Sequence, residues 1–263
     1  MIKNIQKTEG IVIKHIPIGE ADRIVTLISP SIGKIRAVAR GARKPKSKMG
    51  GHLTPITRVK ISVAKTKTID QITEVETIES FREIKEDLYL LSIASYIMEL
   101  AESFVQEDTE AKQIFNLLLQ SITLLQIAPN TKMLIKFFEI KLMSQSGFKP
   151  EMIICSECGI ILVPGSYKFS FESGGLLCHQ CTQKIHTLTN QLSINSIKLI
   201  RFIQNEKFGK IAKLNLTDDL QGEIENVISG YIKYILDKDL KTKSFLDLIA
   251  KQTKNSISSK SLL

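Results

Sequence analysis

Residues 21–47 read ADRIVTLISPSIGKIRAVARGARKPKS and contain two short apolar runs, each followed by a turn. Arg23–Ser29 and Lys34–Arg40 are rich in Val, Ile and Ala and partly alternate apolar with polar residues, a period typical of β-strands. The connection between them holds Pro30 and Gly33, which favour a tight turn. The two runs therefore predict neighbouring antiparallel strands.

Three further runs of the same kind lie on either side of this pair. They are Gly10–His15, Ile56–Ala64 and Ile69–Glu76. Five short strands with no room for crossover helices predict a small barrel over residues 1–80, and a partly open barrel of five strands is typical of the OB fold. An SH3-like barrel is the alternative. The connection Gly41–Pro55 is long and basic, and such loops are usually functional or mobile.

From about Phe81 the apolar residues recur at helical spacing, which predicts amphipathic α-helices. Gly147 follows one of these stretches as a C-cap glycine would. The expected helices are Asp87–Gln106, Glu110–Ile127, Thr131–Ser146, Ser193–Gln204, Leu220–Leu236 and Ser244–Lys251. An all-β beginning is therefore followed by a helical remainder.

The basic residues are concentrated in the first third of the chain. The 263 residues include 36 Lys+Arg and 27 Asp+Glu, a formal charge of +9. Residues 1–82 hold 16 Lys+Arg and seven Asp+Glu, whereas residues 83–263 hold 20 of each. Between Asp22 and Asp70 there are 12 bases and no acid. Because a solvated face normally mixes both signs, this block indicates a polyanionic partner such as a nucleic acid.

The third expected strand and the loop after it bring many of these bases together. The residues expected to bind DNA are Lys34, Arg36, Arg40, Arg43, Lys44, Lys46 and Lys48. The bases expected to extend this patch are Arg58, Lys60, Lys65 and Lys67. Arg23 follows Asp22 directly, so it belongs either to the patch or to an internal ion pair.

Aromatic residues show the opposite distribution, since all 11 Phe and five Tyr lie at Phe81 or later. Proteins that bind single strands without sequence preference usually stack bases on aromatic side chains. The barrel region lacks such side chains, so we expect binding by phosphate neutralisation and counterion release, without base reading. Such binding screens the charge of two strands and leaves their base faces free to pair, as annealing requires.

All four cysteines follow the spacing C-x2-C-x19-C-x2-C, which is within the range of tetrathiolate zinc sites. The predicted ligands of one Zn²⁺ are Cys155, Cys158, Cys178 and Cys181. Disulfides are the alternative, but they suit secreted proteins, and the start MIKNIQKTEG has no apolar signal core. Four thiolates close the coordination of the metal, so the zinc is expected to be structural rather than catalytic.

Together these patterns predict an α+β multidomain protein. An OB-fold DNA-binding domain is expected over residues 1–80 and a helical domain over 81–263, with a zinc-ribbon insertion at 151–187. No apolar run approaches the ~20 residues of a membrane span. No phosphate-binding loop, H-E-x-x-H or G-x-S-x-G motif is present. We therefore expect no membrane contact and no enzymatic activity.

The runs Gly19–Pro30 (GEADRIVTLISP) and Gly33–Lys44 (GKIRAVARGARK) resemble the bacterial RecO family of recombination mediators. The order of parts is also similar to that family: a basic barrel, a helical bundle, a zinc ribbon inserted between helices, and a helical C-terminus. The likeness covers nearly the whole chain. The cysteine pairs alone are not specific for it.

The resemblance implies DNA repair by the RecF pathway, in the bacterial cytoplasm and associated with the nucleoid. It implies binding of single- and double-stranded DNA, annealing of complementary strands, and action with RecR to load recombinase. It also implies binding of the acidic C-terminal tail of single-strand DNA-binding protein by the helical part. No enzymatic turnover is implied.

Two functions from other classes stay open on the residues alone. A zinc-ribbon RNA-binding or translation-associated factor would prefer structured RNA to DNA. A metal-dependent nuclease would cleave strands with Mg²⁺ or Mn²⁺ and would stop with EDTA.

Overall fold

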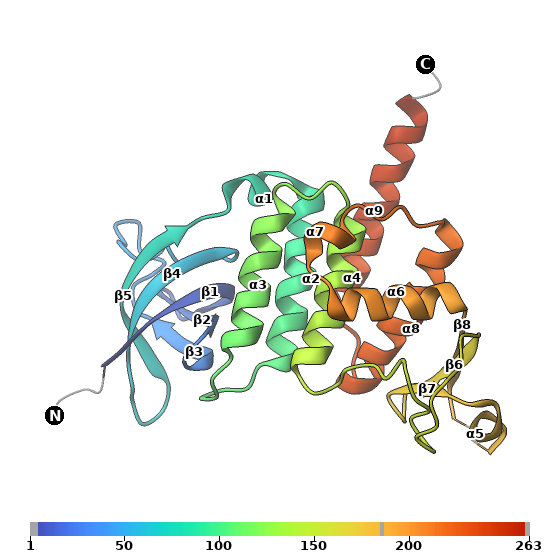
Figure 1. Ribbon diagram of the computed structural model, residues 1–263. Helices are drawn as coiled ribbons and strands as arrows, with labels where there is room; N and C mark the ends of the chain where they lie inside the picture. Colours follow the sequence, from blue (N-terminus) through green and yellow to red (C-terminus); the bar gives the residue numbers. More distant parts are fainter. Residues whose placement is uncertain (1–4, 185–186, 261–263) are drawn as a thin grey trace. The chain divides into compact units, whose positions relative to one another are not determined.

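A computed structural model describes residues 5–184 and 187–260 of the chain (Figure 1). The described residues form two compact units. The first contains those of Met1–Ile127 and Lys241–Leu263, and the second contains those of Ala128–Leu240. A helix from the C-terminal end of the chain therefore belongs to the same unit as the N-terminal strands.

Five strands of the first unit form a closed barrel in the order β1-β2-β3-β5-β4. They are β1 (Ile5–Ile18), β2 (Asp22–Ser29), β3 (Gly33–Ala39), β4 (Thr57–Ala64) and β5 (Asp70–Glu79). β1 pairs antiparallel with β2 and with β4, while β5 pairs antiparallel with β4 and parallel with β3, which closes the ring. All five expected strands are present, and β1 is longer at both ends than Gly10–His15.

Alternation along the strands fills the inside of the barrel with small and branched apolar side chains. In β3 the inward residues are Ile35, Ala37 and Ala39, all buried. The outward residues Ile11 of β1 and Ile28 of β2 are also fully buried. In this unit α2 (Leu88–Phe104) contacts β1 and α3 (Lys112–Leu125) contacts β2, so both faces of this part of the sheet are covered.

The remaining helices of this unit flank α2. They are α1 (Arg82–Glu86) and α9 (Lys241–Lys260), and both contact α2. The carboxylate of Asp87 accepts a hydrogen bond from the Leu90 N–H at 2.9 Å and caps the start of α2. Glu99 of α2 accepts from the Thr242 N–H at 2.8 Å, which satisfies a backbone donor in the first turn of α9.

The loop between β3 and β4 is anchored against the barrel near both of its ends. Ala42 and Leu53 from its two ends are part of the buried barrel core, and Met49 packs against that core. Inside the loop, Ser47 Oγ accepts from the N–H of Met49 at 3.3 Å and of Gly50 at 3.2 Å. The loop thus covers one part of the barrel with a defined backbone path.

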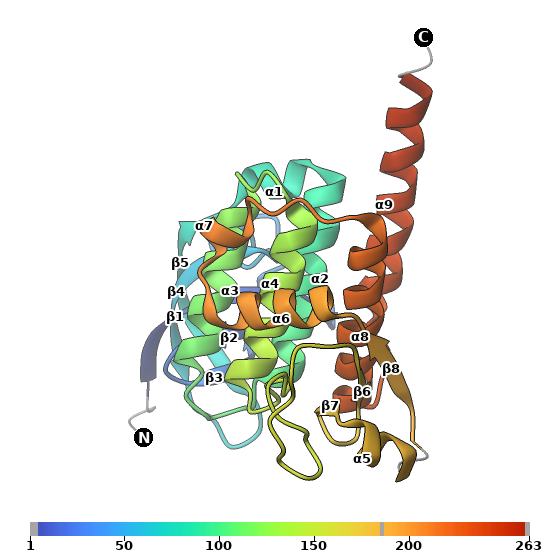
Figure 2. The ribbon, with the colours of Figure 1, turned by 45° about the vertical axis from the view of Figure 1, so that its right-hand side comes forward.

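The second unit contains four helices among its residues of 128–184 and 187–240 outside the cysteine region. They are α4 (Thr131–Gln145), α6 (Ile194–Asn205), α7 (Phe208–Ile211) and α8 (Asp218–Leu236). α6 runs across α4 (Figures 1 and 2) and also contacts α8. Asn130, Ser193 and Thr217 cap α4, α6 and α8 through their side-chain oxygens, as helix N-caps do.

The cysteine region of this unit is a small ribbon. Its strands β6 (Tyr167–Ser170), β7 (Gly175–Leu177) and β8 (Thr189–Leu192) pair in the order β7-β6-β8, and α5 (His179–Lys184) follows β7. Phe169 of β6 packs its ring 5.2 Å from that of Tyr231 on α8, so the ribbon rests on that helix. The ribbon sheet extends beyond the expected insertion at 151–187, because its strand β8 begins at Thr189.

Candidate nucleic-acid interface and metal centre

The outward face of β3 carries the first of the expected DNA-binding residues. Because side chains alternate along a strand, burial of Ile35, Ala37 and Ala39 places Lys34 and Arg36 on the outside. Lys34 is partly exposed and Arg36 is exposed. Arg40 follows β3 directly and is exposed as well.

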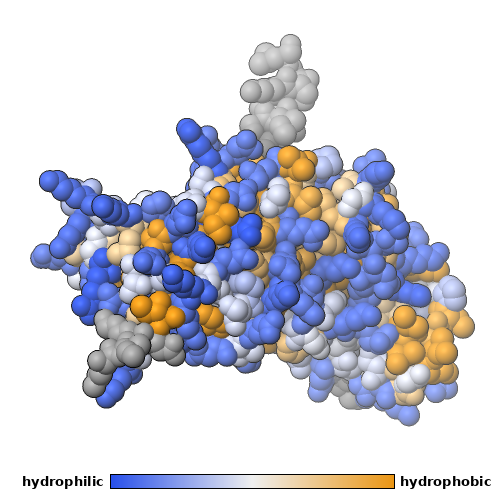
Figure 3. All heavy atoms as spheres, turned by 60° about the vertical axis from the view of Figure 1, so that its left-hand side comes forward, coloured by the Kyte–Doolittle hydropathy of each residue, from blue (hydrophilic) through white to orange (hydrophobic). Residues whose placement is uncertain are grey.

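The loop after β3 supplies the other four expected cations. Arg43, Lys44, Lys46 and Lys48 are all exposed. We call the seven residues Lys34, Arg36, Arg40, Arg43, Lys44, Lys46 and Lys48 the basic surface. Within the part of the chain that the structure describes, none of the seven forms an ion pair with a carboxylate. Figure 3 shows hydrophilic side chains projecting from this side of the barrel.

The basic loop is positioned by β1, β2 and the turn between them. Asp22 Oδ1 accepts from the Gly41 N–H at 2.7 Å, and the Ala21 carbonyl accepts from the Arg43 N–H at 2.8 Å. At the other end of the loop, Arg23 donates to the Gly50 carbonyl at 3.1 Å. Asp22 and Arg23 thus hold the two ends of the loop. Among the described residues Arg23 forms no ion pair and donates instead to a backbone carbonyl, so its place in the patch stays a prediction.

The bases that were expected to extend the patch from β4 and beyond lie in different surroundings. Arg58 forms an ion pair with Glu9 of β1 at 2.6 Å, and Lys65 pairs with Asp70 at 3.0 Å and with Asp108 at 2.8 Å. That Arg58 and Lys65 extend the patch stays a prediction, but both have carboxylate partners in the folded chain. Glu9 and Asp108 come from parts of the chain that are distant in sequence, which the local charge pattern did not reveal.

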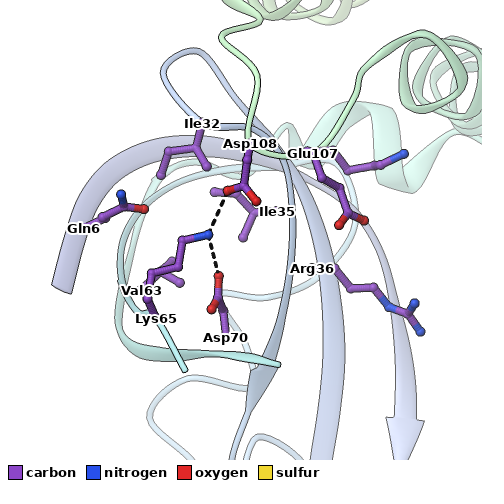
Figure 4. Close-up of a pocket in the computed structure, with 10 residues that line it drawn as sticks. Gln6, Ile32, Ile35, Arg36, Val63, Lys65, Asp70, Glu107 and Asp108 are labelled. Carbon is purple, nitrogen blue, oxygen red and sulfur yellow. Dashed lines mark hydrogen bonds and ion pairs between the residues drawn. The ribbon is translucent and has the colours of Figure 1, made fainter. Parts of the chain in front are cut away.

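Lys65 lies in a small polar pocket near the start of β3. In Figure 4 its ammonium group points between Asp70 and Asp108. Hydrogen bonds that Lys65 donates to Asp108 and to Asp70 raise the pKa of Lys65 above its ordinary value. Hydrogen bonds to carboxylates favour the charged form of a lysine, so this group stays protonated across the physiological range.

The four cysteine sulfurs of the ribbon form one cluster. All four Sγ atoms lie within 4.8 Å of one another, and those of Cys158 and Cys178 are 3.8 Å apart. Tetrahedral Zn–S bonds of about 2.3 Å place the sulfurs about 3.8 Å apart. A disulfide requires about 2.05 Å, and all four thiols are free. The donor set therefore fits a tetrahedral metal ion and not the disulfide alternative.

The protonation of the cluster also fits a cation at its centre. Burial raises the pKa of the Cys155 thiol, but N–H groups of Cys158, Cys178 and Glu157 outweigh it and lower the pKa to about 6. The Cys178 N–H lies 3.3 Å from Cys155 Sγ. The hydrogen bond to Cys178, then burial and the other sulfurs, raise the pKa of Cys181 to about 12. Several thiolates so close together repel one another, and a divalent cation offsets that repulsion.

Glycines set the backbone of the two cysteine knuckles. Gly159 follows the first pair at φ +74°, and its N–H donates to the Cys155 carbonyl at 2.9 Å. Gly175 has no room for a side chain, because a Cβ there would lie 2.6 Å from Glu151 Cβ. The backbone approach that brings the second pair beside the first therefore requires glycine at this position.

Among the described residues, no helix combines the length and the apolar character that crossing a membrane requires.

Comparison with known proteins agrees with this arrangement along the whole chain. The family "Recombination protein O N terminal" matches residues 1–81, and "Recombination protein O C terminal" matches residues 85–244. These matches place the chain in the class of DNA repair proteins.

Individual relatives extend the match over nearly the full length. The chain is 36% identical to the DNA repair protein RecO of Dehalococcoides mccartyi over 246 residues, 93% of this chain and 96% of that protein. It is 33% identical to the DNA repair protein RecO of Desulforamulus reducens over 247 residues, 94% of this chain and 96% of that protein. The chain belongs to the RecO family.

Proposed function

We propose that this chain is a non-catalytic DNA-binding protein of recombinational repair. It binds single- and double-stranded DNA mainly through phosphates and anneals complementary strands. The observation that carries the proposal is the basic surface, in which seven cations project from β3 and the adjoining loop outside any ion pair with a described carboxylate. Membership of a DNA repair family supports the same role.

The geometry suits a nucleic acid that the protein recognises by the charge of its phosphates and not by its base sequence. Lys34 and Arg36 stand on a strand, and the loop cations stand on a backbone that Asp22 and Arg23 hold in place. The barrel carries no aromatic side chain for base stacking, so bound bases keep their pairing edges free. Two strands screened in this way can pair.

We propose the OB fold for the closed barrel, since five strands in one small Greek-key barrel are typical of it. The corresponding domains are residues 1–80 for DNA binding and 81–263 for the helical part, with the ribbon inserted at 151–187. The four cysteines would hold one structural Zn²⁺, which would supply the cross-link that the ribbon needs to fold.

Family membership supports three further parts of the proposal. The chain acts with RecR to load recombinase in the RecF pathway. It binds the C-terminal tail of single-strand DNA-binding protein through its helical part. It works in the bacterial cytoplasm on nucleoid DNA.

The salt dependence of binding to a single strand tests the phosphate mechanism. If about five phosphates are neutralised, the plot of log affinity against log salt has a slope of about −3 to −4. A slope near zero would contradict binding through phosphates.

An annealing assay without ATP tests the role itself. Complementary strands coated with single-strand DNA-binding protein should pair faster when the chain is added. Strand cleavage that needs Mg²⁺ and stops with EDTA would instead support a nuclease, and preference for structured RNA would support an RNA-binding factor.

A further inference from the structure

An acidic connection between α2 and α3 lies along the basic strand β3. The Lys34 N–H donates to the Gln106 carbonyl at 3.0 Å, and Lys34 and Glu107 form an isolated parallel bridge. The Ala111 N–H donates to the Pro30 carbonyl at 3.1 Å. Gly33 permits this approach, because a Cβ there would lie 2.7 Å from the Gln106 carbonyl oxygen. Backbone contacts on both sides therefore fix the connection beside β3.

Side chains from this connection face cations of the barrel in one pocket (Figure 4). Its cationic lining is Lys34, Arg36 and Lys65, and its acidic lining is Asp70, Glu107 and Asp108. Lys65 is the group that both sides share, since it contacts Asp70 at 3.0 Å and Asp108 at 2.8 Å. Lys65 is therefore neutralised near the start of β3, whereas Lys34 and Arg36, which line the same pocket, form no ion pair with a described carboxylate.

The two partners of Lys65 differ in how easily they can leave. The side chain of Asp70, which begins β5, is only 18% exposed. The side chain of Asp108 is 71% exposed and belongs to a connection residue with φ +52°. Exposed ion pairs contribute little to stability. A phosphate oxygen offers Lys65 the same kind of charge-assisted hydrogen bond that the Asp108 carboxylate makes.

We propose that Asp108 is an internal substitute for a DNA phosphate. A backbone phosphate displaces the Asp108 carboxylate from Lys65 and occupies a site that Lys34 and Arg36 complete. Lys65 then extends the basic surface only when DNA is bound. This inference rests on the proposed DNA binding, and it adds a residue and a competition that the basic surface alone does not contain.

The test measures single-strand affinity between about 50 and 200 mM salt, the range in which phosphate contacts separate clearly. Asp108→Asn removes the carboxylate that competes with phosphate for Lys65. We therefore expect affinity at low salt to rise about two- to five-fold, which corresponds to the energy of an exposed ion pair. The slope of log affinity against log salt should stay that of the wild type, because Lys65 contacts a phosphate in both chains once DNA is bound.

Glu110→Gln is the matched control, because Glu110 is an exposed acid of the same connection outside the pocket lining. It should change affinity less and leave the slope unchanged. Adding Lys65→Gln to Asp108→Asn should make the slope shallower than that of the wild type by about 0.7, because one phosphate contact is lost. Equal effects of Asp108→Asn and Glu110→Gln, or weaker binding in Asp108→Asn, would overturn the displacement. A wild-type chain that does not bind DNA would overturn the proposed function itself, which distinguishes the two failures.

Discussion

The barrel of the first unit and the ribbon of the second differ in how many of their apolar side chains are exposed. The barrel buries a continuous cluster, with Val25, Leu27 and Leu53 fully inaccessible. The ribbon leaves Ile161 74% exposed and Val163 70% exposed, and Figure 3 shows apolar side chains gathered at the lower right. Burial of apolar area stabilises the barrel, whereas the ribbon buries Phe169, Leu176 and Leu192 but also carries exposed apolar side chains and the four-sulfur cluster.

In the barrel, the residues that stabilise the fold are distinct from the charged residues that could contact a partner. The barrel core is complete beneath the basic surface, so charges there can change without a loss of packing. In the ribbon the four clustered cysteines could hold a metal ion, so we expect the same residues to determine both metal binding and folding. Variants in the two regions should therefore fail in different ways, and four experiments test this, from the largest effect to the smallest.

Metal removal should give the largest effect, and it should be confined to the second unit. Structural zinc contributes about 10–16 kcal/mol of apparent binding free energy in small zinc domains. Chelation, or Cys178→Ser, should abolish stoichiometric zinc binding and the hydrogen-exchange protection of the ribbon amides, while the barrel amides keep theirs. His179→Ala is the control, since His179 lies between two ligands and is not among the four clustered groups. Equal loss of protection in both regions would contradict the comparison.

Truncation of an apolar side chain should cost stability in the barrel and not in the ribbon. Leu53→Ala should lower the free energy of opening of the barrel by about 2–5 kcal/mol, because it removes a fully buried side chain. Ile161→Ala removes an apolar group of similar size that is 74% exposed, and we expect a change within about 0.5 kcal/mol. Hydrogen exchange of barrel and ribbon amides measures both. A large cost for Ile161→Ala would show that the ribbon surface is covered in the protein.

Charge reversal in the basic loop should weaken DNA binding without loss of stability. In Lys44→Glu, Lys46→Glu and Lys48→Glu combined, three phosphate contacts are lost. We expect affinity for a single strand to fall about 100-fold at 0.1 M salt, with a slope shallower by about 2. The loss should be uniform across sequences, because phosphate contacts carry no sequence information.

The same change of charge placed elsewhere provides the control for this prediction. Lys168, Lys198 and Lys213 are exposed residues of the second unit, and their reversal to Glu changes the net charge equally. It should reduce affinity far less. A loss limited to particular sequences would point to base readout and against the phosphate mechanism.

A pH effect on the barrel should be the smallest of the four. Burial, and then the charge of Arg23, lower the pKa of His15 below its ordinary value of 6.5. The unfolded chain therefore binds a proton before the folded barrel does, so stability present above pH 6.5 falls as pH drops toward the folded pKa. His15→Gln should reduce this fall, as measured by barrel hydrogen exchange at several pH values. An unchanged pH dependence would exclude His15 as its source.

Much of the fold was predictable because it depends on local patterns. The Val- and Ile-rich runs predicted all five strands, and the helical spacing predicted a helix that begins at Thr131, where α4 begins. The third expected strand was predicted to carry basic residues, and Lys34 and Arg36 lie on its outward face. The cysteine spacing predicted which sulfurs would meet, since two tight knuckles leave few other arrangements. Each of these properties is carried by residues close together in the chain.

Contacts between distant residues were decided only by the tertiary structure. The sequence itself determined a basic barrel region without aromatic residues and a four-cysteine cluster. It did not reveal that Glu9 neutralises Arg58, that Asp108 reaches Lys65, or that Asp22 and Arg23 hold the basic loop. The physical reason is that a charge count sums over the chain, whereas an ion pair depends on distance in space, which strand register and connection path set. Only the folded barrel separates the cations that have carboxylate partners from the described cations that have none.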